Sequence, residues 1–194
     1  MNNSLKVLVI DDSLLHRLSA GVFLKDNNIT VVDSYFEGAK ILLRECDFDV
    51  VLVDLLMPAS SYAQGPDGQK YIGQEMPVGI FLALMAAKAG AKYVAVFTDS
   101  DHHAHPASAC FDHFNKNEDN PTPLLVNGAK LWLTNNRSWM EKFGGGWDDP
   151  KWLLELSEED RSKALAMYDE AAGKSCWKWS GAKNWQKLLN YMLA

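Results

Sequence analysis

Cysteine is scarce in this sequence, and long apolar runs are absent from it. The three cysteines, Cys46, Cys110 and Cys176, lie far apart with no CxxC spacing, so they do not make the framework of a disulfide-stabilised fold. No apolar run reaches the roughly 18 residues that a membrane-spanning helix requires, and no basic region precedes the first apolar run. We therefore expect no membrane partner, and the cytoplasm is the expected location.

Basic residues are also in the minority. The chain has 19 Lys and Arg residues against 25 Asp and Glu residues, a net charge of −6, and no Lys/Arg run of five or more. This balance argues against electrostatically driven binding to nucleic acid, and no helix-turn-helix or other DNA-reading module is recognisable after residue 143. We therefore expect no nucleic acid among the partners.

Short apolar runs alternate with helical patterns from residue 6 onward, as in proteins with parallel sheets. The runs that predict strands cover residues 6–10, 29–32, 50–53, 93–97 and 131–135. Patterns of helical spacing lie between them at residues 14–23, 37–46 and 79–89. Residues 123–126 compete for the role of the fifth strand. The alternation predicts a doubly wound α/β fold with a five-stranded parallel sheet in the flavodoxin-like order 2-1-3-4-5.

Two segments lie outside this alternation. Residues 59–76 form a polar, turn-rich loop of about 18 residues, longer than most connections in such folds and therefore functional or disordered. Beyond Arg137 the composition changes, because a linker at residues 144–150 precedes two further helical patterns and six of the seven tryptophans follow residue 138. We expect one domain over residues 4–142 and a tryptophan-rich helical extension, residues 143–194, that packs on it. A partner-binding surface is the alternative role for the tryptophans.

Polar side chains follow three of the predicted strands at the point where each strand ends. Asp11 and Asp12 follow the first strand, Asp54 follows the third, and Thr98 follows the fourth. In an open α/β sheet ligands bind at the carboxyl ends of the strands, so the expected strand order brings these side chains into one crevice. Acidic oxygens are the ligands that Mg²⁺ prefers, and a carboxylate can attack phosphorus to give an aspartyl phosphate.

The most unusual segment is rich in histidine. Four of the five histidines, including His102, His103 and His105, lie within twelve residues, next to Asp101. Imidazole and carboxylate can bind zinc, iron or nickel, but the spacing matches no motif as specific as HExxH. A metal-dependent hydrolase that uses these four side chains is one alternative. A polar loop whose histidines cap a helix or stay solvated is the simpler interpretation.

Two other α/β classes fit less well. A dinucleotide-binding fold needs a glycine-rich turn after its first strand, and residues 11–14 contain no glycine. A haloacid-dehalogenase-like phosphatase needs two acids separated by one residue at that place, whereas Asp11 and Asp12 are adjacent.

Three stretches of the sequence resemble the receiver domain of two-component response regulators. They are KVLVIDDS at residues 6–13, VLVDLLMP at residues 51–58 and VFT at residues 96–98. The resemblance covers roughly residues 4 to 142. It implies phosphorelay signalling without enzyme activity, with Asp54 as phosphoacceptor, Mg²⁺ held by Asp11, Asp12 and Asp54, and Thr98 as switch hydroxyl. The implied partners are a sensor histidine kinase or phosphotransfer protein and a downstream protein.

The sequence departs from the receiver pattern at two positions. Receivers carry a lysine before a proline at the end of the fifth strand, and Asn135 stands there instead. Lys130 lies roughly 16 Å away along a strand, and Lys116 would have to fold back. The second departure is Asp99, a carboxylate where a small residue is usual. Both departures disfavour a stable phosphoryl state, so a phosphorylation-independent interaction module is the alternative function.

Overall fold

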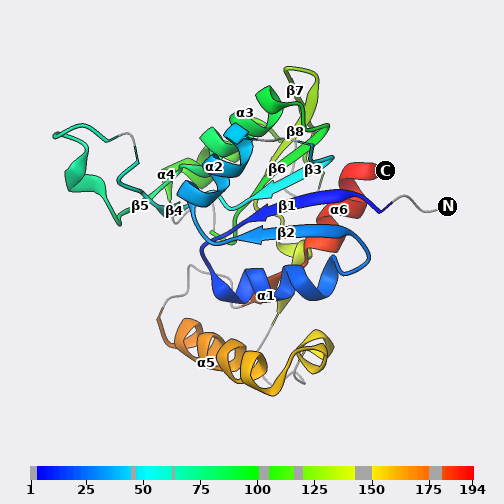
Figure 1. Cartoon of the computed structure of the whole chain (residues 1–194). Helices are drawn as coiled ribbons and strands as arrows, with labels where there is room; N and C mark the ends of the chain where they lie inside the picture. The colour runs from blue at the N-terminus through cyan, green and yellow to red at the C-terminus, as the bar shows by residue number, and fades with distance from the viewer. Residues whose placement is uncertain are drawn as a thin grey trace.

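The computed structural model describes residues 4–44, 47–62, 64–100, 105–115, 120–142, 150–174 and 181–194. A mostly parallel sheet of six strands lies at the centre of an α/β fold, with helices on both faces (Figure 1). Its strand order is β2-β1-β3-β6-β8-β7. The bounds are β2 Asn28–Val32, β1 Lys6–Ile10, β3 Val50–Val53, β6 Tyr93–Phe97, β8 Ala129–Thr134 and β7 Leu124–Val126.

The sheet has one strand more than the sequence predicted. Residues 124–126 do not compete with the fifth strand, because they form β7, which pairs antiparallel with β8 at the edge of the sheet. The turn between them places Asn127 at φ 50° and Gly128 at φ 87°. Both values lie in the left-handed region that a tight two-residue hairpin turn requires, and Asn and Gly adopt it most readily. The other neighbouring strands pair in parallel.

The continuous apolar runs are buried on both faces of the sheet, as parallel strands require. All four residues of β3 are fully buried. One face packs against α2 (Tyr35–Arg44) and α3 (Gly79–Ala89) through residues such as Leu42 and Leu82. The other face packs against α1 (Leu14–Phe23) and α6 (Trp185–Leu193) through residues such as Ala20 and Trp185. The alternation of side chains along each strand thus supplies two separate cores.

The loop that follows β3 is closed at its base. β4 (Met57–Pro58) pairs antiparallel with β5 (Glu75–Met76), and the 3-10 helix η1 (Gln69–Tyr71) lies between them in the chain. α3 begins soon after β5, so this loop connects the end of the Asp54 strand to a helix that covers the sheet. Further along the chain, α4 (Pro106–Ala109) and the 3-10 helix η2 (Cys110–His113) lie between β6 and β7.

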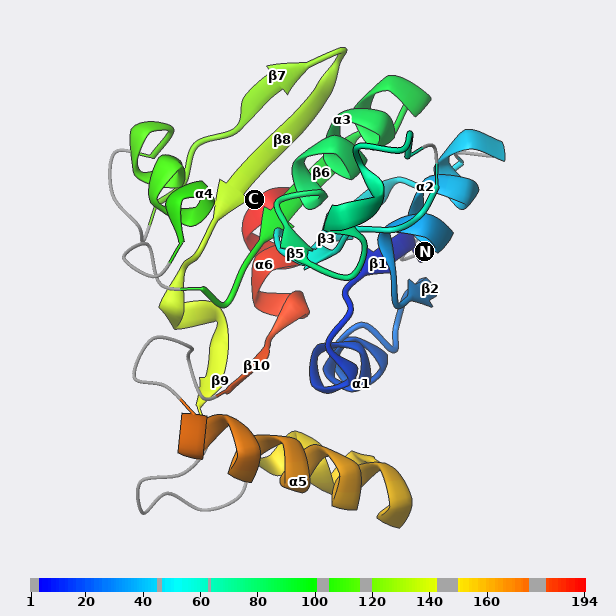
Figure 2. The same cartoon turned by 90° about the vertical axis from the view of Figure 1, so that its left-hand side faces the viewer.

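The segment after β8 forms a two-stranded ribbon in addition to helices. η3 (Arg137–Trp139) leads into β9 (Met140–Lys142), which pairs antiparallel with β10 (Gly181–Lys183). Between them the chain forms η4 (Lys151–Glu155) and α5 (Glu158–Lys174). Figure 2 shows this two-stranded ribbon leading to α5, while α6 returns to the sheet.

Two sets of contacts show how the C-terminal elements pack on the rest of the chain. Trp152 and Leu153 of η4 and Ala164 of α5 share a buried cluster with Leu15 of α1. On α6, the Trp185 ring lies edge-on to Phe97 of β6 at a centroid distance of 5.7 Å. Among the described residues, we find no helix with both the length and the apolar character needed to cross a bilayer.

Candidate functional site

Two of the predicted acids meet at the carboxyl ends of neighbouring strands. Asp11 directly follows β1 and Asp54 directly follows β3; their exposures are 0% and 5%. The Asp11 Oδ1 accepts a hydrogen bond from the Ser13 N–H at 2.9 Å, and the Asp54 Oδ2 accepts one from the Leu56 N–H at 3.0 Å. Each carboxylate therefore has one oxygen fixed by the turn that follows its own strand.

The remaining oxygens of both carboxylates bind a lysine that the sequence analysis did not consider. The Nζ of Lys183 lies 2.7 Å from Asp11 Oδ2 and 2.5 Å from Asp54 Oδ1. The side chain of Lys183 is fully buried, and its ammonium lies 5.6 Å and 5.1 Å from the ring centroids of Phe97 and Trp185. A buried charge is tolerated where it is paired and hydrogen-bonded. The site thus contains a cation that reaches both acids.

The backbone of Lys183 is held by α1. Its N–H donates to Nδ1 of His16 at 3.4 Å, and its carbonyl accepts a hydrogen bond from the Ser19 hydroxyl at 2.9 Å. Asn184, the next residue, caps α6 by accepting the N–H of Lys187. Lys183 is therefore the last residue of a short ribbon strand, two residues before a buried helix, and its side chain is aimed at the acids.

Asn135 does stand at the end of the fifth parallel strand, where receivers carry a lysine, but the site contains a cation from elsewhere in the chain. Asn135 follows β8 and is buried, and the cation comes instead from the far end of the segment that separates β8 from α6. Lys130 pairs in register with Tyr93 at the start of β6, away from the acids, as the sequence suggested. Lys116 lies outside the described residues. One signal was available: Lys183 stands two residues before the final amphipathic helix.

Negative charge exceeds positive charge in this site. Burial raises the pKa of Asp54 to about 7; the charge of Lys183 opposes this shift, and the charges of Asp11 and Asp99 add to it. Burial, followed by the charge of Asp11, also raises the pKa of the half-buried Asp12. Burial disfavours the charge on Lys183, but the surrounding carboxylates outweigh it and raise the pKa of Lys183 above its usual range.

The raised pKa of Asp54 predicts a specific dependence of stability on pH. Between pH 3.8, the unperturbed value, and about pH 7, the folded chain binds a proton that the unfolded chain has released. The stability that this group contributes is complete below the lower value and is lost as pH rises through the upper one, a change of up to about 4 kcal/mol.

We expect Asp54→Asn to remove this contribution. Chemical unfolding of both proteins between pH 4.5 and pH 8 measures it, because other titrating groups cancel in the difference. The variant should gain stability relative to the parent chain as pH rises. A difference that does not change with pH would show that Asp54 is already ionised at low pH.

Thr98, the predicted switch hydroxyl, and its neighbour Asp99 have different surroundings. Thr98 directly follows β6 and is buried, and its hydroxyl oxygen accepts the Ser100 N–H at 3.1 Å. Asp99, a carboxylate where receivers have a small residue, lies with Oδ2 3.4 Å from Nε2 of the buried His16. His16 thus links Asp99 to the backbone of Lys183. The second departure from the receiver pattern therefore has a partner in the fold.

The carbonyl of Asp54 is packed as closely as its carboxylate. Gly79, the first residue of α3, lies against it, so that a Cβ at residue 79 would be 1.9 Å from the Asp54 carbonyl oxygen. The Gly79 N–H donates to the Leu55 carbonyl at 3.1 Å. Only glycine allows this approach, and it fixes α3 to the end of the Asp54 strand.

The chemistry of the acids suits Mg²⁺. Carboxylate oxygens are its preferred ligands. Burial is the main cause of the raised pKa values of Asp12 and Asp54, and the charge of neighbouring Asp11 adds to both. Within the described residues, no group of three or more His, Cys, Asp or Glu side chains is arranged to hold a metal ion. Mg²⁺ binding by Asp11, Asp12 and Asp54 therefore remains a prediction.

The histidine-rich segment is described only in part. Asp101, His102 and His103 lie outside the described residues. His105 accepts the N–H of Ala107 through Nδ1 at 3.1 Å and so caps α4. This one histidine takes the helix-capping role that the sequence offered as the simpler interpretation.

Comparisons of this chain with protein-family models, with curated proteins and with solved structures found no match.

Proposed function

We propose that this chain is a receiver module of a two-component phosphorelay, in which Asp54 accepts a phosphoryl group and Lys183 supplies the cation that pairs with it. The observation that carries the proposal is the pair of buried contacts from Lys183 Nζ to Asp11 and Asp54. The five parallel strands β2, β1, β3, β6 and β8 are then the flavodoxin-like order 2-1-3-4-5 of a receiver, with β7 as an added edge strand.

The proposed chemistry is a transfer between two nucleophiles. A carboxylate oxygen of Asp54 forms a bond to phosphorus while the bond from phosphorus to the donor breaks, and the electron pair leaves with the donor. Because only the ionised carboxylate attacks, a pKa near 7 leaves a reactive fraction at neutral pH. Mg²⁺ held by Asp11, Asp12 and Asp54 would neutralise charge on the transferring oxygens.

Lys183 has a defined part in this proposal. It lies at Asp54 Oδ1, within reach of a group attached to that carboxylate, and a charge-assisted contact is roughly twice as strong as a neutral one. Transfer would draw the ammonium from Asp11 toward the phosphoryl oxygens. Because α1 holds the Lys183 backbone through His16 and Ser19, such a shift would reach α1 and the ribbon. Thr98 would be the accompanying switch hydroxyl.

The proposed partners follow from this role. A sensor histidine kinase or phosphotransfer protein would donate the phosphoryl group, and a downstream protein would recognise the changed surface. We place the chain in the cytoplasm, where the exposed thiol of Cys110 would stay reduced.

Phosphorylation of Asp54 is directly testable. Incubation with acetyl phosphate and Mg²⁺ should add one phosphoryl group per chain by intact mass, and Asp54→Asn should abolish the adduct because it removes the nucleophile. Asp33→Asn is the matched control, since Asp33 follows β2 at the same edge of the sheet but is exposed. Beryllofluoride should change tryptophan fluorescence, because Trp185 lies 5.1 Å from the Lys183 ammonium.

A phosphorylation-independent interaction module is the second candidate function. The same ion pairs favour it, because Lys183 already neutralises part of the acidic charge when no phosphoryl group is attached. A complete lack of adduct under saturating donor, with Asp54 intact and the chain folded, would reject the phosphoacceptor role and leave this one.

A further inference from the structure

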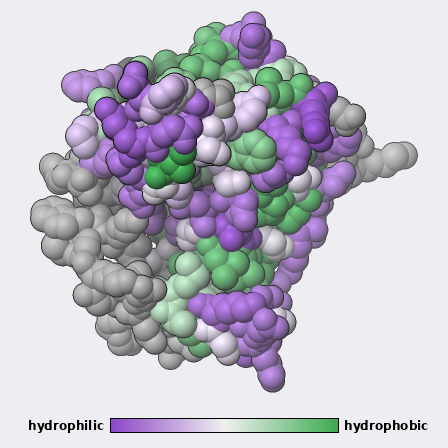
Figure 3. All heavy atoms as spheres, turned by 60° about the vertical axis from the view of Figure 1, so that its left-hand side comes forward, coloured by the Kyte–Doolittle hydropathy of each residue, from purple (hydrophilic) through white to green (hydrophobic). Residues whose placement is uncertain are grey.

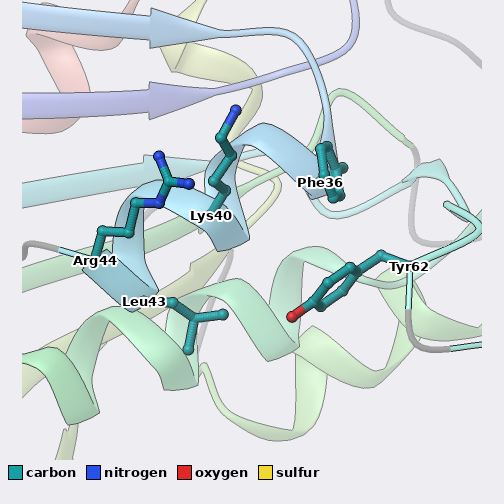
Figure 4. A pocket seen from close by; sticks show the side chains of 5 residues that line it. All are labelled: Phe36, Lys40, Leu43, Arg44 and Tyr62. Carbon is teal, nitrogen blue, oxygen red and sulfur yellow. The ribbon is translucent and has the colours of Figure 1, made fainter.

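Two pockets lie side by side where α2, α3 and the loop 59–76 meet. The first has a volume of about 270 Å³ and is lined by Phe36, Lys40, Leu43, Arg44 and Tyr62 (Figure 4). The second has a volume of about 330 Å³ and extends from Tyr62 to Tyr71 and Phe81. Tyr62 belongs to both, so the two pockets form one groove.

Aromatic side chains form the middle of this groove. The rings of Phe36 and Tyr62 meet edge to face at a centroid distance of 5.5 Å. Figure 4 shows the Tyr62 ring reaching from the loop toward Leu43 of α2. The walls therefore come from two segments that contact each other directly, so a ligand would meet a surface that is already formed.

Several large apolar side chains around the groove are exposed to solvent. Leu43, Phe81 and Tyr62 are 63%, 58% and 49% exposed. α3 is apolar around most of its circumference, a pattern that belongs to a helix covered on all sides, yet it leaves Phe81 and Leu84 open. Figure 3 shows green hydrophobic areas scattered among purple hydrophilic ones on the face that it presents. Exposed apolar side chains that gather around a groove are typical of a docking site.

Two basic side chains lie at one end of the groove. Lys40 and Arg44 line the first pocket, and among the residues that the structure describes no acidic side chain lines either pocket, although the whole chain carries a net charge of −6. Glu37 on the same helix neutralises part of Lys40 through a 3.1 Å contact. Arg44 thus supplies the main positive charge, and it lies beside the exposed Leu43.

We propose that this groove binds an acidic, amphipathic segment of a partner protein. Its leucine or aromatic side chains would fill the two pockets, and its carboxylates would lie over the first pocket, next to Arg44 and Lys40. A helix laid in a groove, with apolar side chains three or four residues apart, satisfies both requirements. This docking goes beyond the receiver role, because no step of it uses the Asp54 carboxylate.

A pair of synthetic peptides tests the proposal. One is a helical peptide with leucine and phenylalanine at helical spacing and glutamate at the other positions; the second has lysine in place of every glutamate. Titration by fluorescence anisotropy should show the acidic peptide binding at least about tenfold more tightly, because complementary charge favours it and like charge rejects the other. Equal affinity, or no binding of the acidic peptide, would overturn the proposal.

Matched variants locate the contact. Arg44→Glu should weaken binding of the acidic peptide about tenfold or more, whereas Lys88→Glu should leave it unchanged. Lys88 is exposed near the end of α3, outside the lining of both pockets, and the two substitutions change the net charge equally. Phe81→Ser tests the apolar end, and thermal unfolding confirms that each variant is folded. An equal effect of the two charge reversals would contradict docking in the groove.

Two further measurements separate this docking from phosphorylation and from self-association. Asp54→Asn should bind the peptide as the parent chain does, so a failed phosphorylation assay would not affect this inference. Sedimentation of the parent chain should show a single copy. Self-association that Arg44→Glu abolishes would mean that a second copy fills the groove, and it would overturn the proposed partner.

Discussion

Replacing Lys183 with methionine should lower the free energy of unfolding by about 3–5 kcal/mol at neutral pH, because it leaves the buried carboxylates of Asp11 and Asp54 without a cation. Methionine has a similar length and keeps contact with Phe97 and Trp185, so the loss reports the charge and not a cavity. Chemical unfolding at pH 7 and at pH 5 measures it. The loss should be smaller at pH 5, where Asp54 is more protonated.

The control and the rescue are both available in the chain. Lys130→Met removes an exposed lysine on β8 and should change stability by less than about 0.5 kcal/mol. Adding Asp54→Asn to Lys183→Met should restore part of the loss, because one of the unpaired charges is then gone. If Lys183→Met unfolds at the same denaturant concentration as the parent chain, Lys183 does not hold these acids together in solution.

Replacing Gly79 with alanine should destabilise the fold by about 3 kcal/mol, which is the upper part of the range for overpacked cores. The added Cβ would lie 1.9 Å from the Asp54 carbonyl oxygen, and backbone cannot yield as a flexible side chain does. α3 would have to move away from the end of β3. Since Asp54 belongs to the same peptide unit, the variant should also accept phosphoryl groups more slowly than the parent chain.

A second glycine serves as the control for this substitution. Gly21 lies in the exposed part of α1, and no atom lies within 4 Å of the position that its Cβ would take. Gly21→Ala should therefore stabilise the chain by about 0.5–1 kcal/mol, through helix propensity alone. Thermal unfolding of both variants decides the matter. A Gly79→Ala protein as stable as Gly21→Ala would show that α3 does not press on Asp54.

The sequence predicts the parallel core of this fold well, for a local reason. Runs such as residues 50–53 are short, rich in valine and apolar without interruption, which is the pattern of a strand buried on both faces. The edge hairpin was predictable too, because Asn127-Gly128 between two apolar runs is a strong hairpin signal, but the choice between residues 123–126 and 131–135 obscured it. β4 and β5 are two residues long and leave no periodic signal.

The acids of the site were predictable and its cation was not. Asp11 and Asp54 end strands whose order follows from the connections, so their meeting is a local consequence of the fold. Lys183 reaches them through a contact between residues far apart in sequence, set by the pairing of β9 with β10 and by the docking of α6. No spacing rule relates Lys183 to Asp54. The groove likewise depends on how Tyr62 of the loop meets α2.

Because Lys183 comes from the C-terminal segment, truncation of this protein would affect the acidic site. A fragment that ends near residue 142, where composition suggests a boundary, would keep Asp11 and Asp54 but lose their counterion, the ribbon partner of β9 and the helix that covers one face of the sheet. The C-terminal segment is thus an internal component of the acidic site. Shortened versions for expression or fusion should therefore retain everything from Gly181 onward.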